Sequence, residues 1–154
     1  MWKKLRLEAL QDVPESFGLS YEEEANYSES RWQEILEKND IFGAFINDEL
    51  VATICFNIMD MLKTKHRGII WGVYTIPKFR RQGILRTLME TVINHAKSHV
   101  IQLNLKCWTN NQYAVKTYQK FGFKIYGTER RALKIANNFF DMHLMVLDLD
   151  TVSE

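Results

Sequence analysis

The segment from Lys78 to Arg86 contains residue types that suit the binding of an anion. It joins an apolar, strand-like run to an amphipathic helical pattern. Up to four backbone N–H groups lack partners at the start of a helix, where the macrodipole also favours negative charge. Gly83 lets the backbone approach a ligand closely, and basic side chains surround it. The segment therefore predicts a pyrophosphate site, with a solvated basic loop as the alternative, although it matches neither a P-loop nor a GxGxxG fingerprint.

A second segment, from Asn111 to Phe123, has polar residues that share one helix face. Tyr118 stands four residues after Ala114 and seven after Asn111, so the three side chains lie on the same side of a helix. A tyrosine hydroxyl can act as a general acid, whereas a half-buried tyrosine that only packs is the alternative. Asn111 is also a good N-cap, and capping can coexist with a role in a site.

The elements that position these segments follow from hydrophobic periodicity and capping signals. Ser20 to Glu23 fits a capping box, and the polar turn Asn47-Asp48-Glu49 between two apolar runs predicts a β-hairpin. An apolar stripe at helical spacing runs from Ile84 to Ala96, and apolar residues alternate from Ile101 to Cys107. We expect helices at 2–11, from Ser20 to about Lys38, at 84–96 and at 112–121, and strands at 41–46, 50–58, 66–76, 101–107, 123–129 and 140–149. The run 69–76 is apolar on both faces, as in a covered central strand, and a strand-helix-strand crossover makes 101–107 parallel to it. The chain therefore predicts an α/β fold with a mixed sheet.

Composition limits the classes of partner. The 154 residues fit one domain over 1–154, and 20 basic against 19 acidic residues leave a formal charge of +1, too balanced for nucleic-acid binding through counterion release. No signal-peptide pattern or membrane-length apolar run is found, so a cytoplasmic protein without membrane contact is expected. Cys55 and Cys107 fall in apolar runs and are interpreted as reduced core thiols.

Two motifs give the chain a family resemblance. Arg80 and Gly83 match the [R/Q]-x-x-G-x-[G/A] pattern of the GNAT superfamily of N-acetyltransferases, although Leu85 stands where Gly or Ala is usual. Asn111 to Phe123 is similar to the N-x-x-A-x-x-x-Y-x-K-x-G-F pattern of the same superfamily without a departure. The resemblance is to bacterial-type small single-domain members and spans roughly residues 2 to 149.

The resemblance implies a fold and a cofactor. The fold is a mostly antiparallel mixed sheet with one central, splayed parallel strand pair and about four helices. Acetyl-CoA is the implied cosubstrate, without a metal. The implied cofactor-binding residues are Val73, Tyr74 and Thr75 for the pantetheine arm, the pyrophosphate loop Arg80, Arg81, Gln82, Gly83, Ile84, Leu85 and Arg86, and Asn111 and Tyr118. Tyr118 is the implied catalytic acid that protonates the departing thiolate.

The acceptor implied by the resemblance is a primary amine of a small molecule or peptide. Glu22 to Glu24 match a segment near the acceptor cleft, or form a solvated helix start. The strand from His66 to Ile76 contains no Asp or Glu, so we expect water to carry the amine proton, with His66 or one of these glutamates as remote help. A base elsewhere in the chain is the alternative.

Other readings of the sequence lead to different functions. An acyl-CoA-binding or regulatory module without turnover is the main rival, whereas acetylation of charged tRNA would need a more basic surface. An acyl-cysteine mechanism through Cys107 lacks a paired histidine. His66, His95, His99 and His143 show no metal-ligand spacing, so they predict surface or packing roles.

The chain begins inside the expected first helix, so the first strand of the family is either absent or removed by trimming of the chain start. Without that strand, the strand at 41–46 has an unpaired edge. The edge allows pairing with a second copy, so a homodimer is one expectation.

Overall fold

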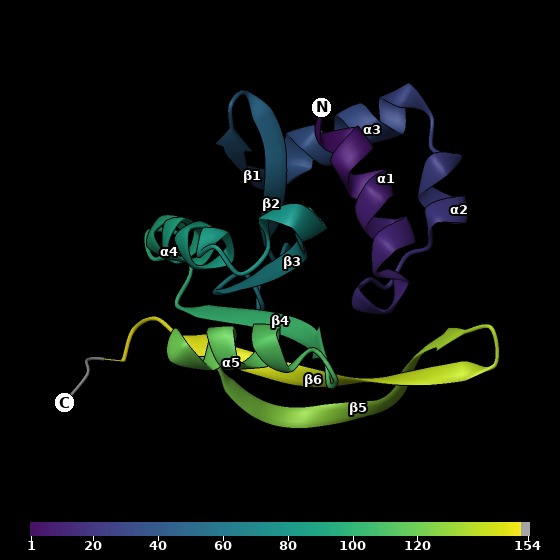
Figure 1. Cartoon of the computed structure of the whole chain (residues 1–154). Helices are drawn as coiled ribbons and strands as arrows, with labels where there is room; N and C mark the ends of the chain where they lie inside the picture. The colour runs from purple at the N-terminus through teal and green to yellow at the C-terminus, as the bar shows by residue number, and fades with distance from the viewer. Residues whose placement is uncertain (152–154) are drawn as a thin grey trace. The chain divides into compact units, whose positions relative to one another are not determined.

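A computed structural model describes residues 1–151 of the chain (Figure 1). Its helices are α1 (Trp2–Asp12), α2 (Tyr21–Ala25), α3 (Glu29–Lys38), α4 (Ile84–Ala96) and α5 (Gln112–Lys120), with short 3₁₀ helices η1 (Pro14–Ser16) and η2 (Pro77–Phe79). Its strands are β1 (Asp40–Ile46), β2 (Glu49–Ile58), β3 (Arg67–Thr75), β4 (Gln102–Trp108), β5 (Lys124–Ile135) and β6 (Asn138–Asp148).

The strands form one six-stranded sheet in the order β1-β2-β3-β4-β6-β5. β3 and β4 are parallel, whereas β1 with β2, β4 with β6 and β5 with β6 are antiparallel. This confirms the predicted mixed α/β fold with one parallel pair. β1 stands at one end of the strand order, as expected for the strand predicted to have an unpaired edge.

Residue contacts divide the chain into two compact units. Unit 1 comprises Met1–Asn57 and Ile70–Asn94, and unit 2 comprises Ile58–Ile69 and the chain from His95 onward. The single domain over residues 1–154 stays a prediction. No helix within residues 1–151 has both the length and the apolar character needed to span a membrane.

In unit 1, the helix expected from Ser20 to Lys38 is two helices. The predicted capping box is present, because the Glu23 N–H donates to Ser20 Oγ (3.2 Å) and the Ser20 N–H donates to Glu23 Oε2 (2.9 Å). α2 then ends at Ala25, and α3 begins after a second N-cap, Ser28, whose Oγ accepts from the Arg31 N–H. The single-helix prediction was wrong because Ser28 favours capping over continuation of a helix.

The first hairpin of unit 1 has a two-residue turn. Asn47 and Asp48 adopt φ of 48° and 63°, as the tight turns that match strand twist require. β2 is buried on both faces from Val51 to Phe56. The predicted hairpin is confirmed, with Glu49 in β2 instead of in the turn.

Two apolar clusters form much of the core of unit 1. In one, α1 contributes Leu5, Ala9 and Leu10, which pack with Phe17 and Tyr74. In the other, Trp2, Trp32 and Cys55 are buried, with Trp71 packed against them. The stripe predicted on α4 is buried at Leu88, Met89, Val92 and Ile93.

In unit 2, the alternation predicted for β4 holds from Leu103 onward, whereas Ile101 lies before the strand and is 48% exposed. Leu103, Leu105 and Cys107 are buried, and β4 pairs with β6 along its whole length. The parallel pairing with β3 joins Arg67–Ile69 to Gln102–Asn104, and the Arg67 Nε–H donates to Asn104 Oδ1 (3.1 Å).

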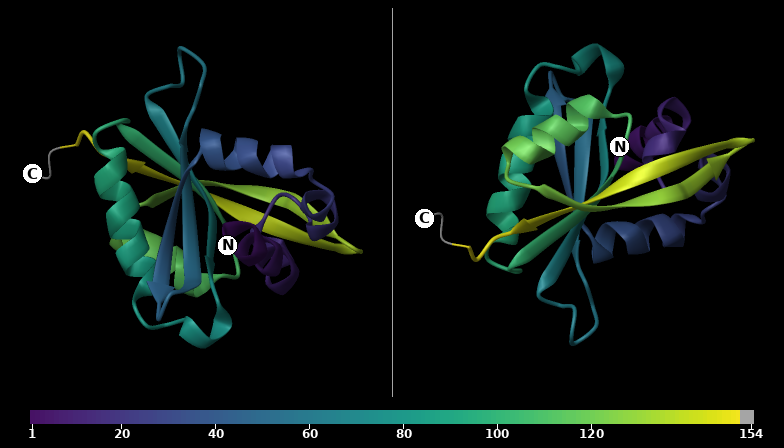
Figure 2. Two further views of the ribbon diagram at one scale, coloured as in Figure 1. Left: turned by 90° about the horizontal axis from the view of Figure 1, so that it is seen from above. Right: turned by 90° about the horizontal axis from the view of Figure 1, so that it is seen from below.

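The last two strands are longer than predicted. β5 and β6 form a hairpin that extends as a long twisted ribbon in both views of Figure 2. We expected a connection between 129 and 140, but β5 continues to Ile135. The strand register shifts between Glu129 and Leu133, and Arg131 has φ of 52°. A bulge of this kind interrupts the alternation from which strands are predicted.

Candidate functional site

The predicted anion-binding loop adopts a left-handed backbone at two positions. Arg81 has φ of 60° and Gly83 has φ of 81°, immediately before α4. A left-handed conformation is costly for arginine and easy for glycine. Strained residues of this kind often mark ligand sites, so Arg81 supports the interpretation of the loop as functional.

The space beside Gly83 is open. A Cβ placed on Gly83 would meet no atom within 4 Å, and Arg81, Gln82 and Gly83 are exposed. The Gly83 carbonyl accepts from the Thr87 N–H (3.1 Å) and the Thr87 hydroxyl (3.2 Å), which fixes it in the first turn of α4. A ligand can therefore reach the backbone N–H groups at the start of the helix.

Arg80 has partners that the sequence did not reveal. Its Nε–H donates to the Thr75 carbonyl (2.9 Å) and its Nη2–H to Asp12 Oδ2 (2.6 Å). Its guanidinium also lies over the Tyr74 ring, with Cζ 5.5 Å from the centroid. Arg80 therefore connects the loop to β3 and to the end of α1.

The other side chains around the loop also bind within the chain. Arg86 Nε donates to Glu90 Oε1 (3.1 Å), and Lys78 lies 3.7 Å from Glu49. The Gln82 amide donates to the Lys78 carbonyl (3.2 Å). The backbone N–H groups and the helix macrodipole can bind an anion independently of these side chains.

Val73–Thr75 lies at the end of β3. The Tyr74 side chain is buried, and its hydroxyl donates to Asp12 Oδ2 (3.1 Å) and Glu8 Oε1 (3.3 Å). Burial, followed by the charge of Asp12, raises the pKa of Tyr74 above its usual range. Tyr74 therefore anchors α1 to β3 through its side chain.

Gly72 bends β3 just before these residues, a feature that sequence reasoning missed. Its φ is 62°, and a Cβ placed there would lie 3.0 Å from Cys55 Sγ. Both the conformation and the space require glycine. A glycine inside an otherwise apolar strand was the available signal.

In unit 2, Asn111 is the N-cap of α5. Its Oδ1 accepts from the Ala114 N–H (3.2 Å), which confirms the capping alternative. The cap fixes the start of the helix that contains Tyr118. A role for Asn111 in cofactor binding stays a prediction.

Tyr118 lies on the buried face of α5 together with Ala114. Its side chain is 5% exposed and makes an edge contact with Phe123, with ring centroids 6.1 Å apart. Burial raises the pKa of Tyr118 well above that of a free tyrosine, and the neighbouring Cys107 adds to the shift. The hydroxyl therefore keeps its proton at neutral pH, as a general acid must.

Cys107 is a free, buried thiol at the end of β4. Burial raises the pKa of Cys107 to about 12, so its reactive thiolate is scarce at neutral pH. This environment disfavours the acyl-cysteine alternative. Cys55 is also free and buried, as predicted.

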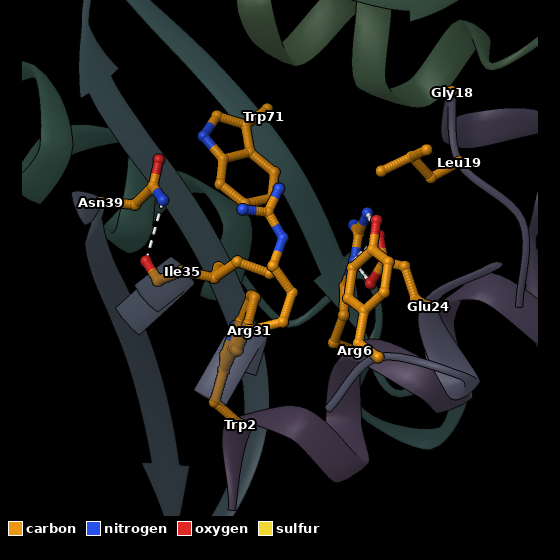
Figure 3. A pocket seen from close by; sticks show the side chains of 10 residues that line it. Trp2, Arg6, Gly18, Leu19, Glu24, Arg31, Ile35, Asn39 and Trp71 are labelled. Atoms are coloured by element: carbon orange, nitrogen blue, oxygen red, sulfur yellow. Dashed lines mark hydrogen bonds and ion pairs between the residues drawn. The ribbon is translucent and has the colours of Figure 1, made fainter. Parts of the chain in front are cut away.

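A cavity of about 370 Å³ lies entirely within unit 1 (Figure 3). Its lining comes from α1, α2, α3, β3 and the segments between them, and comprises Trp2, Arg6, Gly18, Leu19, Glu24, Tyr27, Arg31, Ile35, Asn39 and Trp71. Its size is in the range of sites for small molecules. Of these residues, the family resemblance pointed to Trp71, for the pantetheine arm, and to Gly18, Leu19 and Glu24, in the segment similar to one near the acceptor cleft.

Arg6 and Glu24 form a buried ion pair in the wall of this cavity. Arg6 Nη2 donates to Glu24 Oε1 (2.6 Å), and Arg6 Nε donates to both carboxylate oxygens (3.2 and 3.0 Å). Glu24 is therefore not an available base, and Glu23 is held in the capping box, where the Ser20 N–H lowers its pKa. Of the three glutamates proposed as remote help, only Glu22 is left without such a role.

The described residues do not contain a group of three or more His, Cys, Asp or Glu side chains suited to a metal ion. His143 Nδ1 lies 3.1 Å from the Thr128 hydroxyl, and the rings of His95 and His99 are 4.7 Å apart. His66 is exposed in unit 2, and its carbonyl accepts from the Ile101 N–H.

The chain is similar to known acetyltransferases. It is 28% identical over 112 residues to a protein of Drosophila melanogaster named "Probable N-acetyltransferase san", and 26% identical over 112 residues to N-alpha-acetyltransferase 50 of Danio rerio. Each match covers 71% of this chain but only 60% and 66% of the respective relative.

A solved structure and a family pattern agree with these relatives. The crystal structure of a probable acetyltransferase from Staphylococcus epidermidis superposes with a TM-score of 0.74 at 26% identity, covering 94% of this chain and 91% of that one. Residues 6–123 match the acetyltransferase (GNAT) family. This range includes both Lys78–Arg86 and Asn111–Phe123, the two segments singled out in the sequence. The chain belongs to the acetyltransferase (GNAT) family.

Proposed function

We propose that the protein is an acetyl-CoA-dependent N-acetyltransferase that transfers the acetyl group to a primary amine. The observation that carries the proposal is the start of α4, where Gly83, with φ of 81° and open space beside it, exposes the helix N-terminus to an anion. Membership of the GNAT family supports acetyl-CoA as the source of that anion.

The cofactor contacts follow from the motif resemblance and from the geometry within each unit. The backbone of Val73, Tyr74 and Thr75 binds the pantetheine arm, and the backbone from Arg81 to Arg86 binds the pyrophosphate. Arg80 acts through the Thr75 carbonyl and Asp12, so it is a positioning residue. For Asn111 and Tyr118 the proposal rests on the motif resemblance alone.

The reaction needs no covalent enzyme intermediate. The neutral amine attacks the thioester carbonyl, a tetrahedral oxyanion forms, and the carbon–sulfur bond breaks as the carbonyl re-forms. The departing thiolate takes the proton of the Tyr118 hydroxyl, the proton lost by the amine passes to water, and the Tyr118 phenolate regains a proton from water. Tyr118 is the catalytic residue of this scheme, because it stands at the tyrosine position of the Asn111–Phe123 motif.

An α-amine is the acceptor that best suits a strand β3 without a carboxylate of its own, because the carboxylates of Glu8 and Asp12 beside it are bonded to the Tyr74 hydroxyl. β3 contains no Asp or Glu, and Glu23 and Glu24 are held in other contacts. Holding a lysine-type amine neutral at pH 7 costs about 4.6 kcal/mol, against about 1 kcal/mol for an α-amine. The N-alpha-acetyltransferase 50 relative is consistent with this preference.

The main alternative is an acyl-CoA-binding or regulatory module of the same fold that has lost turnover. Incubation with acetyl-CoA and a panel of polyamines, amino acids, aminoglycosides and peptides, with thiol release as the readout, separates the two. Calorimetry with CoA is the control. CoA binding without acceptor-dependent thiol release would favour the module, and absence of CoA binding would refute both.

We expect one domain over residues 1–154, a cytoplasmic location, and acetyl-CoA and an amine as the partners, with no metal, nucleic acid or membrane. The position of β1 at one end of the sheet is consistent with pairing between two copies.

A further inference from the structure

Asp12 is an acidic residue at a helix end that favours cations. It is the last residue of α1, and the last turn of α1 contains no basic residue. The helix macrodipole places partial negative charge at this end, so a carboxylate here lowers the stability of the helix. Compensation comes from outside α1, because the partners of Asp12 belong to β3 and to the loop before α4.

One oxygen of Asp12 accepts both of these hydrogen bonds. The Tyr74 hydroxyl donates to Asp12 Oδ2 (3.1 Å), and Arg80 Nη2 donates to the same atom (2.6 Å). A carboxylate held by one donor can still turn toward other positions, because its two oxygens offer about four acceptor sites. The Tyr74 hydroxyl therefore restricts the direction from which Asp12 binds Arg80.

Arg80 closes a ring of contacts with this pair. Its Nε–H donates to the Thr75 carbonyl (2.9 Å), and its Cζ lies 5.5 Å from the centroid of the Tyr74 ring. The Arg80 side chain is 40% exposed, and a single ion pair at such a position contributes little. The combination of a shared carboxylate, a backbone carbonyl and an aromatic ring holds the guanidinium more firmly than the ion pair alone.

The Tyr74 ring is the rigid member of this network. It is 4% exposed and packs with Leu5, Leu10 and Phe17 in the apolar cluster of unit 1. A ring packed in this way has little freedom to turn, so its hydroxyl has a fixed place, and a buried tyrosine hydroxyl needs a partner. Tyr74 is therefore the fixed point from which Asp12 is oriented.

Glu8 provides a matched comparison on the same helix face. It stands four residues before Asp12, and its Oε1 lies 3.3 Å from the Tyr74 hydroxyl. The hydroxyl has one proton, and its contact with Asp12 is the shorter of the two. The ion pair of Arg80 is with Asp12 and not with Glu8. Glu8 is thus a carboxylate at the same hydroxyl that does not hold the loop.

The position of Arg80 affects the backbone that follows it. Arg81 has φ of 60° and Gly83 has φ of 81°, so the strained part of the loop starts directly after Arg80. Strained backbone persists only where the surrounding structure holds it. The contacts of Arg80 provide this support before the strained part, and the bonds from Thr87 to the Gly83 carbonyl provide it afterwards.

We propose that the side chain of Tyr74 is a positioning group for the binding of acetyl-CoA. Its hydroxyl orients the Asp12 carboxylate, and Asp12 holds Arg80 at the start of the loop. The inference rests on the proposed function, because that function assigns the loop to the pyrophosphate. Tyr74 acts through other residues, so its loss should change cofactor affinity and not the chemical step.

The test is a double-mutant cycle between Tyr74 and Arg80. Tyr74→Phe keeps the ring and removes the hydroxyl, so it should raise the KM for acetyl-CoA about 2- to 5-fold and leave kcat within about twofold. In the Arg80→Ala background the same substitution should have no further effect on this KM. The matched control Glu8→Gln should leave the KM for acetyl-CoA within about twofold of wild type.

Three results would overturn the assignment. They are an unchanged KM in folded Tyr74→Phe, a full additional effect of Tyr74→Phe in the Arg80→Ala background, and an equal rise in Glu8→Gln. If Tyr74→Phe does not fold, Asp12→Ala decides the matter. An unchanged KM in Asp12→Ala would show that Tyr74 cannot act through Asp12, whereas a rise that disappears in the Arg80→Ala background is expected.

A binding measurement keeps this proposal separate from the proposed function. Calorimetry with CoA should show about 2- to 5-fold weaker binding to Tyr74→Phe than to wild type, whether or not the protein transfers acetyl groups. Weaker binding to Tyr74→Phe without acetyl transfer by wild type would refute the proposed function and leave the role of Tyr74 standing. Absence of CoA binding by wild type would refute both.

Discussion

At the scale of single residues, Tyr118 has the environment of an acid that rarely loses its proton. Tyr118→Phe removes only the hydroxyl from a side chain that is 5% exposed, so folding and CoA affinity should change little. Turnover should fall by roughly 10²–10⁴-fold if the hydroxyl protonates the thiolate. Single-turnover kinetics check the chemical step. Near-normal turnover would leave Tyr118 as a packing residue.

Gly83 tests the backbone contribution to the phosphate site. Gly83→Val should weaken CoA binding more than Arg81→Ala does, because valine both blocks the backbone and is strained at φ of 81°. Contacts at a helix terminus are each worth about 0.3–2 kcal/mol, so losing several is measurable by calorimetry. Unchanged CoA affinity in a folded Gly83→Val protein would remove this loop from the cofactor site.

Arg80 allows a test of positioning against direct contact. Arg80→Ala should weaken acetyl-CoA binding in either case, whereas Asp12→Asn separates them. If Arg80 positions the loop through Asp12, Asp12→Asn should raise the KM for acetyl-CoA about 2- to 5-fold, the range expected for a partly exposed pair. If Arg80 contacts phosphate directly, Asp12→Asn should free it and leave that KM unchanged or lower.

At the scale of elements, the parts with unbroken periodicity were predictable. The stripe of α4, the alternation of β4 and the capping box at Ser20 all have local causes, and all three are confirmed. The break between α2 and α3 and the length of β5 were missed. The second cap at Ser28 and the register shift in β5 depend on competition between local and long-range hydrogen bonds. The spacing of apolar residues gives no information about that competition.

The site was predictable only where its residues are close in sequence. The loop from Arg80 to Leu85 and the segment from Asn111 to Phe123 are short motifs. The Arg6–Glu24 pair joins positions 18 apart, and the Arg80–Asp12 pair joins positions 68 apart. Only the packing of α1 against its neighbours brings these groups together, so the cavity of unit 1 and the anchoring of Arg80 required the structure.

At the scale of the whole molecule, the pH dependence of kcat/KM shows which groups donate and which groups accept protons in the reaction. The rising limb of kcat/KM should follow the pKa of each acceptor, because β3 offers no carboxylate base. The pKa of Tyr118 is raised, so its protonated form persists to higher pH, and the falling limb should lie above the usual tyrosine value of about 10. α-Amines should therefore react faster than lysine-type amines near neutral pH.

This prediction is checked by pH–rate profiles with the best acceptor of each amine type. A rising limb fixed near pH 6 to 7 for every acceptor, and abolished by one substitution, would identify a dedicated protein base. The water-mediated scheme would then be wrong, while the assignment of Tyr118 would stand on its own falling limb.

The alkylation rates of the two cysteines report how often each unit opens. Cys55 belongs to unit 1 and Cys107 to unit 2, and burial raises the pKa of each thiol to about 12. An alkylating reagent reacts with the thiolate, so each site is modified essentially only when its surroundings open. Equal modification rates, followed by peptide mass spectrometry, are expected if residues 1–154 unfold as one cooperative domain. A faster modification rate at one cysteine would mean that the chain unfolds in two stages. Acetyl-CoA would then lower the modification rate in the unit to which it binds.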